Sequence, residues 1–310
     1  MSSHRRRRRR AVWRPLLAIL VALFLLGGLA IWTNVLGVGD TVGDVARKIE
    51  LIIDPPPDRP IEAEVHVTPR PSQAPTPSPA PTPFVSRPPG APTPAPTPTP
   101  TPVPQRVRVD VNLYSHPDAH FITEVDHEWC AVAGTQMVLA AHGKAPLTEA
   151  FQRKLASRIG EWESRRDSLN GGWGPSAVVS ALEAYGVPGY EVRTYETRAD
   201  ALQDAARAIS TFHSPVLLFA WRGAHTWVMT GYRADADPLQ FDDAKVSGAY
   251  VLDPWYPRVS SIWGPSDPPG TWQNASEMRR NYLPWKRPEG RYPSRDGLFV
   301  AVVPTVAMDR

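Results

Sequence analysis

Cysteine is nearly absent from this sequence, with a single residue, Cys130, among 310. One cysteine excludes an internal disulfide, and with it the disulfide-stapled scaffolds common among small secreted proteins. A lone thiol outside the cell is either a buried core residue or a reactive group. The role of Cys130 therefore depends on whether this segment lies inside or outside the cell and on the side chains that pack against it.

Charge is absent from residues 15–39, which follow a basic run at residues 5–10 and Arg14. An apolar stretch of this length can cross a bilayer as one helix, and flanking basic residues remain cytoplasmic. We therefore predict a cytoplasmic basic tail over residues 1–14, a transmembrane signal anchor over residues 15–39 and an extracellular remainder, in a single-pass protein of the cell membrane. The alternative is a signal peptide cleaved near residues 28–30, which would release a secreted protein; the length of the apolar run favours the anchor.

An excess of positive charge is also absent beyond the N-terminal tail. The whole chain carries a formal net charge of +3, but residues 106–310 contain 22 Lys and Arg against 24 Asp and Glu, a net charge of −2. The basic run is then a topology signal near anionic lipid rather than a nucleic-acid site. We predict the membrane as a partner, through the N-terminal helix, and no nucleic-acid partner.

Regular secondary structure is not expected in residues 55–104, where Pro, Thr, Ala and Ser dominate. Proline fixes φ and lacks an N–H donor, so we expect neither helix nor sheet there. At ~3.1 Å per residue in a polyproline conformation, such a spacer reaches on the order of 100–150 Å. We therefore expect residues 40–105 to form a juxtamembrane segment, with a short helix over residues 40–54, and a disordered linker that holds the next domain away from the membrane.

Residues 106–310 are long enough for one domain with a substantial core. Helical patterns precede most strand patterns in this region, which predicts an α+β fold with helices packed on an antiparallel sheet. The expected helices begin at Cys130 and end at Gly143, and span residues 148–163, 175–185 and 199–209. The expected strands span residues 215–220, 225–232, 249–252 and 298–303.

Cys130 stands at the predicted start of a helix, where the partial positive charge of the helix N-terminus lowers a thiol pKa. A nucleophilic thiol also needs a base. His142 lies further along the same helix, ~18 Å away at 1.5 Å per residue, whereas His225 begins a predicted strand, which is a rigid mount. Asp253 ends the next strand, and neighbouring antiparallel strands can place it beside His225 to hold one imidazole tautomer. A Cys, a His and an Asp in this order are typical of papain-like enzymes.

Four motifs in a fixed order carry a resemblance to one family. They are the helix from Cys130 through Met137-Val138-Leu139, the Gly174-Pro175-Ser176 start of a helix that ends at Tyr185-Gly186, the Gly-x-His-x-Trp-Val-x-x-Gly-Tyr strand around His225, and Asp253-Pro254.

In these motifs, over roughly residues 120–260, the sequence resembles cysteine peptidase family thirty-nine, the bacteriocin-processing, double-glycine-leader type, in its membrane-anchored or secreted members. The resemblance implies a papain-like fold, with Cys130 as nucleophile, His225 as general base and then acid, and Asp253 as the residue that orients His225. We expect no cofactor and no metal ion.

Two positions depart from the family pattern. Ala131-Val132 follow the cysteine, where the family has Gly-Pro, and Glu124 stands six residues before it, where the family has a Gln that donates to the oxyanion. An ionised carboxylate cannot donate a hydrogen bond, and losing one such donor typically costs about 10²–10³ in rate. The Cys130 N–H, His127 or His120 are possible substitutes, and a protonated Glu124 would need a strongly raised pKa.

Other polar and aromatic groups have simpler interpretations. The run Asp126-His127-Glu128 is expected to be a solvated loop, because adjacent residues do not converge on one metal. The acidic residues Asp235, Asp237, Asp242 and Asp243 are expected to form a solvated hairpin rather than a calcium site. Tryptophan and tyrosine crowd residues 255–285, where they either form a small core or line a polymer-binding groove.

The sequence therefore predicts a membrane-tethered, extracellular cysteine peptidase that attacks a peptide or cell-envelope amide bond with Cys130, His225 and Asp253. One alternative is a cell-wall amidase or endopeptidase of related fold. Another is a catalytically inactive papain-like binding domain, which the Glu124 substitution favours. The sequence predicts no particular oligomeric state.

Overall fold

The computed structural model describes residues 20–21, 23–29, 45–46, 49, 53–68, 104–168, 173–286 and 290–307. The chain divides into two compact units, one of residues 1–57 with 169–171 and one of residues 58–168 with 172–310. In the first unit, residues 20–21 and 23–29 are helical. Within the described ranges, no helix combines the length and the hydropathy that a membrane crossing requires. Most of the predicted anchor and of the predicted helix over residues 40–54 lies outside these ranges.

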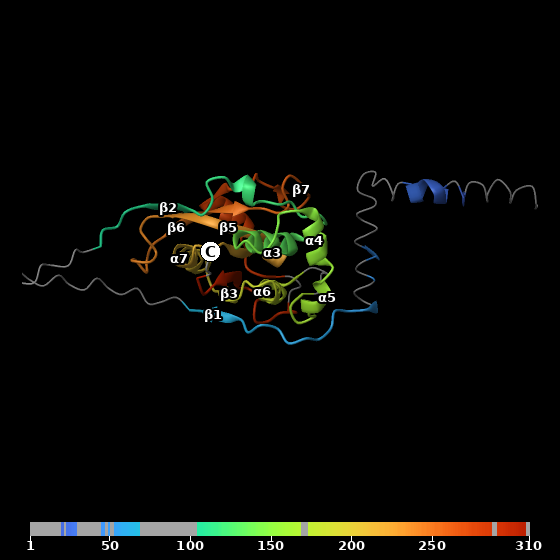
Figure 1. Cartoon of the computed structure of the whole chain (residues 1–310), viewed down its shortest axis with the longest axis horizontal. Coiled ribbons are helices and arrows are strands. Elements are labelled where there is room, and N and C mark those ends of the chain that lie inside the picture. The colour runs from blue at the N-terminus through green and yellow to red at the C-terminus, as the bar shows by residue number, and fades with distance from the viewer. Residues whose placement is uncertain are drawn as a thin grey trace, which may run out of the picture. The chain divides into compact units, whose positions relative to one another are not determined.

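The second unit is built on an eight-stranded sheet of order β1-β3-β10-β4-β5-β6-β9, with β2 paired to the second half of β5 (Figure 1). All pairs are antiparallel except β1 with β3, which is parallel. The strands are β1 (Val65–Val67), β2 (Val109–Asn112), β3 (Tyr190–Tyr195), β4 (Val216–Ala220), β5 (His225–Ala234), β6 (Val246–Leu252), β9 (Thr271–Asn274) and β10 (Phe299–Pro304), beside a separate ribbon of β7 (Val259–Ser260) and β8 (Gly264–Pro265).

Helices cover both faces of this sheet. Leu218 and Ala220 of β4 pack in the same apolar cluster as the buried face of α7, while Leu217, which points to the opposite face of the strand, lies against α3. The predicted α+β class is therefore confirmed. The helical segments are η2 (Pro117–His120), α3 (Cys130–Ala141), α4 (Glu149–Ala156), α5 (Ile159–Trp162), α6 (Pro175–Ala184), α7 (Arg198–Phe212), η3 (Trp221–Gly223) and α8 (Ala275–Asn281).

The α3 helix begins at Cys130, as predicted, and is buried from Ala131 through Leu139. Gly134 allows the helix to approach the sheet, because a Cβ at this position would lie 3.2 Å from Leu217 Cδ2. Gly143, with φ of +66°, follows the helix end. A hydrophobic helix wedged against the central strands fixes the position of its first residue, the thiol.

The prediction of one helix over residues 148–163 is wrong, because the structure has two. Thr148 caps α4 by accepting a hydrogen bond from the Phe151 N–H at 3.3 Å. The chain then turns at Ser157 and Arg158, and Arg158 begins α5 with its guanidinium over the Trp162 ring, 4.6 Å from the centroid. The spacing of apolar residues does not indicate that an arginine packs on a tryptophan. The helical pattern therefore continues across the turn between α4 and α5.

The expectation of no sheet between residues 55 and 104 is also wrong. Residues 61–67 contain no proline and alternate apolar with polar side chains, and β1 in this segment pairs with β3, Val65 opposite Arg193. The chain is part of the second unit from Asp58 onward. The repeats over residues 69–103, which lie outside the described ranges, connect two strands of one sheet and so do not form the predicted spacer that precedes the domain.

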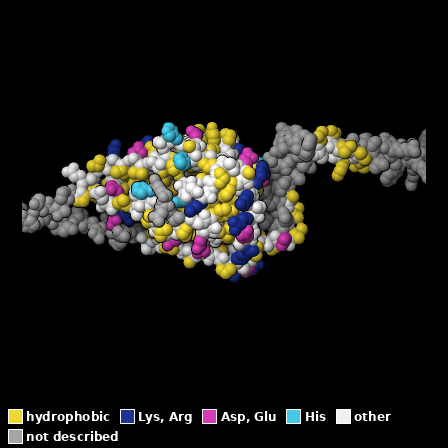
Figure 2. Space-filling view, in the orientation of Figure 1, with side chains coloured by type: hydrophobic (Ala, Val, Ile, Leu, Met, Phe, Trp, Pro, Cys, Tyr) yellow, Lys and Arg dark blue, Asp and Glu magenta, His cyan; other side chains and the backbone are white. Residues whose placement is uncertain are grey.

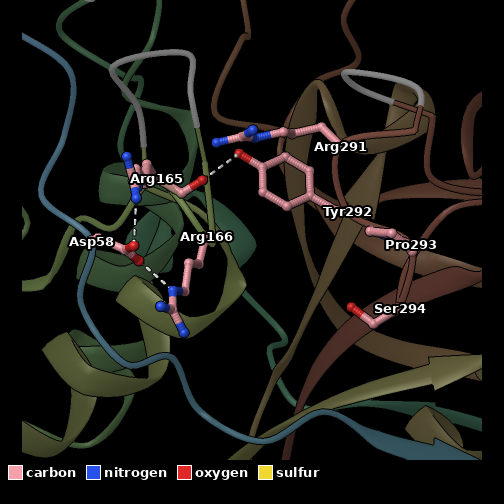
Figure 3. Close-up of a pocket in the computed structure, with 7 residues that line it drawn as sticks. All are labelled: Asp58, Arg165, Arg166, Arg291, Tyr292, Pro293 and Ser294. Atoms are coloured by element: carbon pink, nitrogen blue, oxygen red, sulfur yellow. Dashed lines mark hydrogen bonds and ion pairs between the residues drawn. The ribbon is translucent and has the colours of Figure 1, made fainter.

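Asp58 holds the start of this segment against the loop after α5. Its carboxylate accepts hydrogen bonds from Arg165 Nη2 at 2.5 Å and from Arg166. These bonds, with that to Arg166 contributing most, hold the pKa of Asp58 at about 2. The three side chains line an open pocket of about 390 Å³ together with Arg291 and Tyr292 (Figure 3). Figure 2 shows acidic side chains among the basic ones on this side of the molecule, near α4 and α5.

Arg295 anchors the same segment from inside. It is fully buried, donates to the Asp167 carbonyl at 2.9 Å and to Asp167 Oδ1 at 2.7 Å, and pairs with Glu64 just before β1. Asp167 also accepts from the backbone N–H groups of Ser176 and Ala177 in the first turn of α6. One guanidinium thus joins the segment before β1, the loop before α6 and the C-terminal region.

Replacing Arg295 with Met is expected to lower the free energy of unfolding by about 3–5 kcal/mol, because it leaves two buried carboxylates without their cation. Urea unfolding of the full chain in detergent, followed by tryptophan fluorescence, measures this change. Arg291→Met, at an exposed position, is the matched control and is expected to change stability by less than about 0.5 kcal/mol. Equal stability of the two variants would contradict the anchoring role.

Candidate active site

The candidate site lies where α3, β5 and the end of β6 meet. Cys130 is the first residue of α3, His225 is the first residue of β5, and Asp253 follows the last residue of β6. The two strands pair antiparallel, with Val228 opposite Leu252. This register brings His225 Nε2 to 2.7 Å from Asp253 Oδ1, and both side chains are buried. The structure therefore places together the base and the orienting residue that the sequence predicts.

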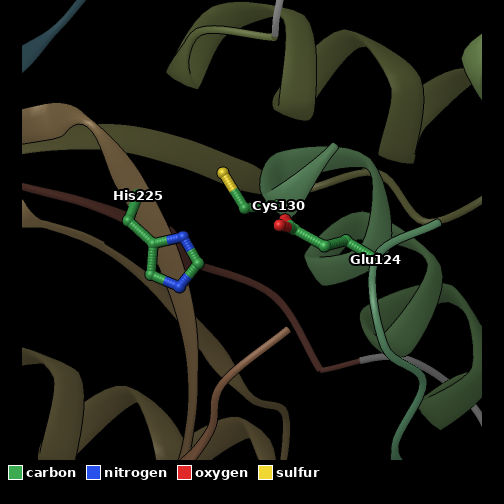
Figure 4. A group of neighbouring side chains, drawn as sticks. All are labelled: Glu124, Cys130 and His225. Carbon is green, nitrogen blue, oxygen red and sulfur yellow. The ribbon is translucent and has the colours of Figure 1, made fainter. Parts of the chain in front are cut away.

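The thiol completes this arrangement. One ligand atom each from Glu124, Cys130 and His225 lie within 4.8 Å of one another, and Figure 4 shows the three side chains converging from separate segments. Asp253 occupies Nε2 of the imidazole, which leaves Nδ1 for the thiol. Cys130 Sγ also lies 4.0 Å from Thr226 Oγ1. Such separations are within the range of loose geometry that a thiol and its base show before substrate binds.

A stack of two tryptophans covers one face of the imidazole ring. The Trp221 ring stacks on His225 at 4.2 Å between centroids, and Trp263 stacks on Trp221 at 5.7 Å. Trp221 and Arg222 have φ of 50° and 65°, a left-handed conformation that costs on the order of 1–3 kcal/mol per residue. The crowded tryptophans thus divide, with Trp263 in the wall of the site and Trp285 buried in the core.

The pKa of the Cys130 thiol is raised, chiefly by burial and next by the charge of Glu124. Hydrogen bonds with Thr226 act in the opposite direction. The expectation that the helix N-terminus gives a lowered thiol pKa is therefore wrong for the resting site. In the resting site the thiol is therefore favoured over the thiolate.

Glu124 is the group that the sequence left in doubt. Its side chain is only 1% exposed, and its backbone N–H donates to the Pro254 carbonyl at 2.9 Å. Arg258 Nη1 lies 3.3 Å from Oε1, while Oε2 has no hydrogen-bond partner in the described part of the chain. Burial raises the pKa of Glu124 well above its usual range, the charge of Asp253 raises it further, and Arg258 opposes both. The neutral acid is thereby favoured.

The two histidines predicted as alternative oxyanion donors pack against other aromatic rings. The His120 ring stacks on Tyr114 at 3.8 Å, and His127 packs edge-on against Trp255 at 5.3 Å. The cluster with Cys130 and His225 contains Glu124 instead.

The acidic hairpin is explained by ion pairs. Arg106 lies 2.7 Å from Asp243 and 3.4 Å from Asp235, and Arg207 lies 2.5 Å from Asp242. These arginines hold the hairpin to the segment before β2 and to α7. Among the described residues, the three His, Cys, Asp or Glu side chains close enough to share a metal ion are those of Glu124, Cys130 and His225. Zinc accepts sulfur, nitrogen and oxygen donors, but thiol chemistry at this site requires no ion.

The sequence matches a family model, and the chain is similar to a solved protease structure. The model of the family described as Peptidase_C39 like matches residues 109–283, from β2 to just beyond α8, and supports a hydrolase of the cysteine peptidase type. Among solved structures, the crystal structure of a double glycine motif protease from an AMS/PCAT transporter in complex with the leader peptide is 18% identical, over 60% of this chain and 91% of that chain, with a TM-score of 0.30. No curated protein matches the sequence.

Replacing His225 with Ala is expected to slow alkylation of Cys130 by iodoacetamide at pH 7 by at least about tenfold, because a thiol with a raised pKa then has no base. The unmodified protein should react faster than this variant, because His225 accepts the thiol proton as the sulfur is alkylated. Mass spectrometry of the full chain measures the rate at its single thiol. The control is His116→Ala, an exposed position; equal rates in the two variants would exclude His225 as the base.

Proposed function

The chain belongs to the Peptidase_C39-like family, and we propose that it is a papain-like cysteine peptidase, tethered to the membrane, that cleaves a peptide bond outside the cell. The observation that carries the proposal is the buried His225–Asp253 hydrogen bond of 2.7 Å beside Cys130. A buried pair of this kind on two strand ends, with a thiol on a helix start, supports nucleophilic catalysis rather than simple packing.

The proposed reaction has two halves. His225 Nδ1 takes the thiol proton as Cys130 Sγ bonds to the substrate carbonyl carbon, and the carbonyl electron pair moves to oxygen. When the tetrahedral intermediate collapses, the C–N bond breaks and the leaving amine takes the proton from His225. Water then attacks the thioester with His225 again as base, which releases the acid and restores the thiol. Asp253 acts as a positioning residue, because it holds the imidazole through Nε2.

The inactive binding domain remains a second candidate because of one observation. Glu124 stands beside the thiol and raises its pKa, and a permanently charged carboxylate there would oppose both the thiolate and the oxyanion. Turnover distinguishes this candidate from the peptidase.

The proposed location rests on the charge pattern of residues 1–39. Since the catalytic unit begins at Asp58, residues 40–57 are the connection to the anchor. At ~3.3 Å per extended residue they reach at most about 60 Å. A tether of this length favours substrates close to the membrane surface, such as exported peptides, over distant layers of the envelope.

Cys130→Ala is expected to abolish labelling by a thiol-directed peptidase probe and to lower turnover of a peptide library by at least about 10³-fold, since it removes the nucleophile. The full chain in detergent is incubated with fluorogenic peptides in one arm and with purified peptidoglycan in another. Peptide cleavage without peptidoglycan fragments supports the peptidase, and fragments alone support the cell-wall amidase. Probe labelling of the unmodified protein without turnover of either substrate supports the binding domain.

The tether is tested with two matched variants in the Cys130→Ala background. Ser247→Cys lies on the exposed start of β6, and Ser3→Cys lies in the predicted cytoplasmic tail. A membrane-impermeant maleimide is expected to label Ser247→Cys in intact cells and Ser3→Cys only after lysis. The reverse pattern would contradict the proposed orientation, and loss of the chain to the medium would indicate a cleaved signal peptide.

A further inference from the structure

Glu124 occupies a position that packing alone does not explain. A buried carboxylate with one oxygen unpartnered is costly unless it is neutral or has a ligand, and Oε2 of Glu124 is such an atom. The side chain lies within 4.8 Å of both the thiol and its base. A hydrogen-bonded main chain holds it there, with the Glu124 N–H on the Pro254 carbonyl and the Val125 N–H on Gln152 Oε1 at 2.6 Å.

We propose that Glu124, as the neutral acid, donates a hydrogen bond from Oε2 to the oxyanion that forms when Cys130 attacks. This inference rests on the proposed peptidase function and adds a catalytic residue to it. The first-turn N–H of Cys130 supplies a second donor, since N–H groups at a helix start have no partner within the helix. A carboxylic acid kept neutral in an apolar site can act as an oxyanion donor.

The contacts of the two Glu124 carboxyl oxygens are consistent with Oε2 as the donor. Arg258 lies on Oε1, at 3.3 Å, and also donates to the Val125 carbonyl at 3.4 Å. The Arg258 guanidinium therefore divides its hydrogen bonds between the Val125 carbonyl and Oε1 of Glu124. Neither of these bonds involves Oε2. Oε1 accepts from Arg258, and Oε2 carries the proton and remains available for the substrate.

The charged groups around Glu124 come from three segments. Asp126 and Glu128 belong to its own loop, Asp253 and Arg258 belong to the segment after β6, and Cys130 and His225 complete the site. Three of these are carboxylates and one is a guanidinium, so the surroundings favour the neutral acid. Because the donor is lost when Glu124 ionises, turnover should fall as pH rises through the Glu124 pKa.

Two variants test the donor role of Glu124. Glu124→Gln keeps a hydrogen-bond donor that does not ionise, and Glu124→Leu removes the donor. Glutamine donates at every pH, so Glu124→Gln is expected to retain much higher turnover than Glu124→Leu and to remove the decline on the alkaline side. Glu124→Leu removes the donor and is expected to lower kcat by about 10²–10³-fold, with little change in KM. Glu183→Gln, at an exposed position on α6, is the matched control and should keep the original pH profile. All assays contain a chelator, to exclude an adventitious metal ion.

Alkylation of Cys130 distinguishes a failure of the Glu124 inference from a failure of the proposed peptidase function, because alkylation needs the base but no oxyanion donor. Fast alkylation in Glu124→Leu together with lost turnover supports the inference. Equal turnover of Glu124→Gln and Glu124→Leu, with fast alkylation in both, would overturn it and leave the peptidase intact. Slow alkylation and absent turnover in the unmodified chain would overturn the proposed function itself.

Discussion

The hydrogen bond between His225 and Asp253 is the contact on which the site depends. It exists because β5 and β6 pair in a register that sets Val228 opposite Leu252, and a slip of one residue would turn one of the two side chains to the other face of the sheet. The turn after β6 links this hydrogen bond to the loop that contains Glu124. Asp253 Oδ1 also accepts from the Trp255 N–H at 2.9 Å, and the Pro254 carbonyl holds the Glu124 N–H. One turn therefore fixes the orienting carboxylate and the loop before the nucleophile together.

Electrostatics then link the members of this cluster. A thiolate at Cys130 would share a small buried volume with Glu124 and Asp253, and Arg258, itself partly exposed, would be the compensating cation. Three negative charges near one guanidinium are unfavourable in a low-dielectric site. A neutral Glu124 removes one of these charges, and proton transfer from Cys130 to His225 pairs another with an imidazolium. The raised pKa values of the thiol and of Glu124 thus share two causes, burial chiefly and the charge of neighbouring carboxylates in addition.

The sequence was most informative where function depends on local structure. A helix start at Cys130, a strand start at His225 and a strand end at Asp253 are each local patterns, and the resemblance to family thirty-nine rested on their order. The burial of Glu124 was not predictable in this way, because it depends on Pro254 and Arg258, more than a hundred residues further along the chain. The stack of Trp221 on His225 was missed for another reason: a left-handed conformation at a tryptophan contradicts ordinary propensity, and no pattern of residues indicates it.

The difference between local sequence patterns and long-range contacts also explains why β1 was not predicted. Proline content dominated residues 55–104, yet the short proline-free stretch before Thr68 forms β1, because β3 offers it an unpaired edge and Arg295 offers Glu64 a buried partner. Once β1 and β2 are both held on the sheet, the intervening chain is a loop whose closure cost rises by only about 0.6 kcal/mol for each doubling of its length. Stability therefore places little limit on the Pro and Thr repeats. It does constrain the strand that precedes them, since without β1 the repeats would be added to the proposed connection between the N-terminal segment and the domain.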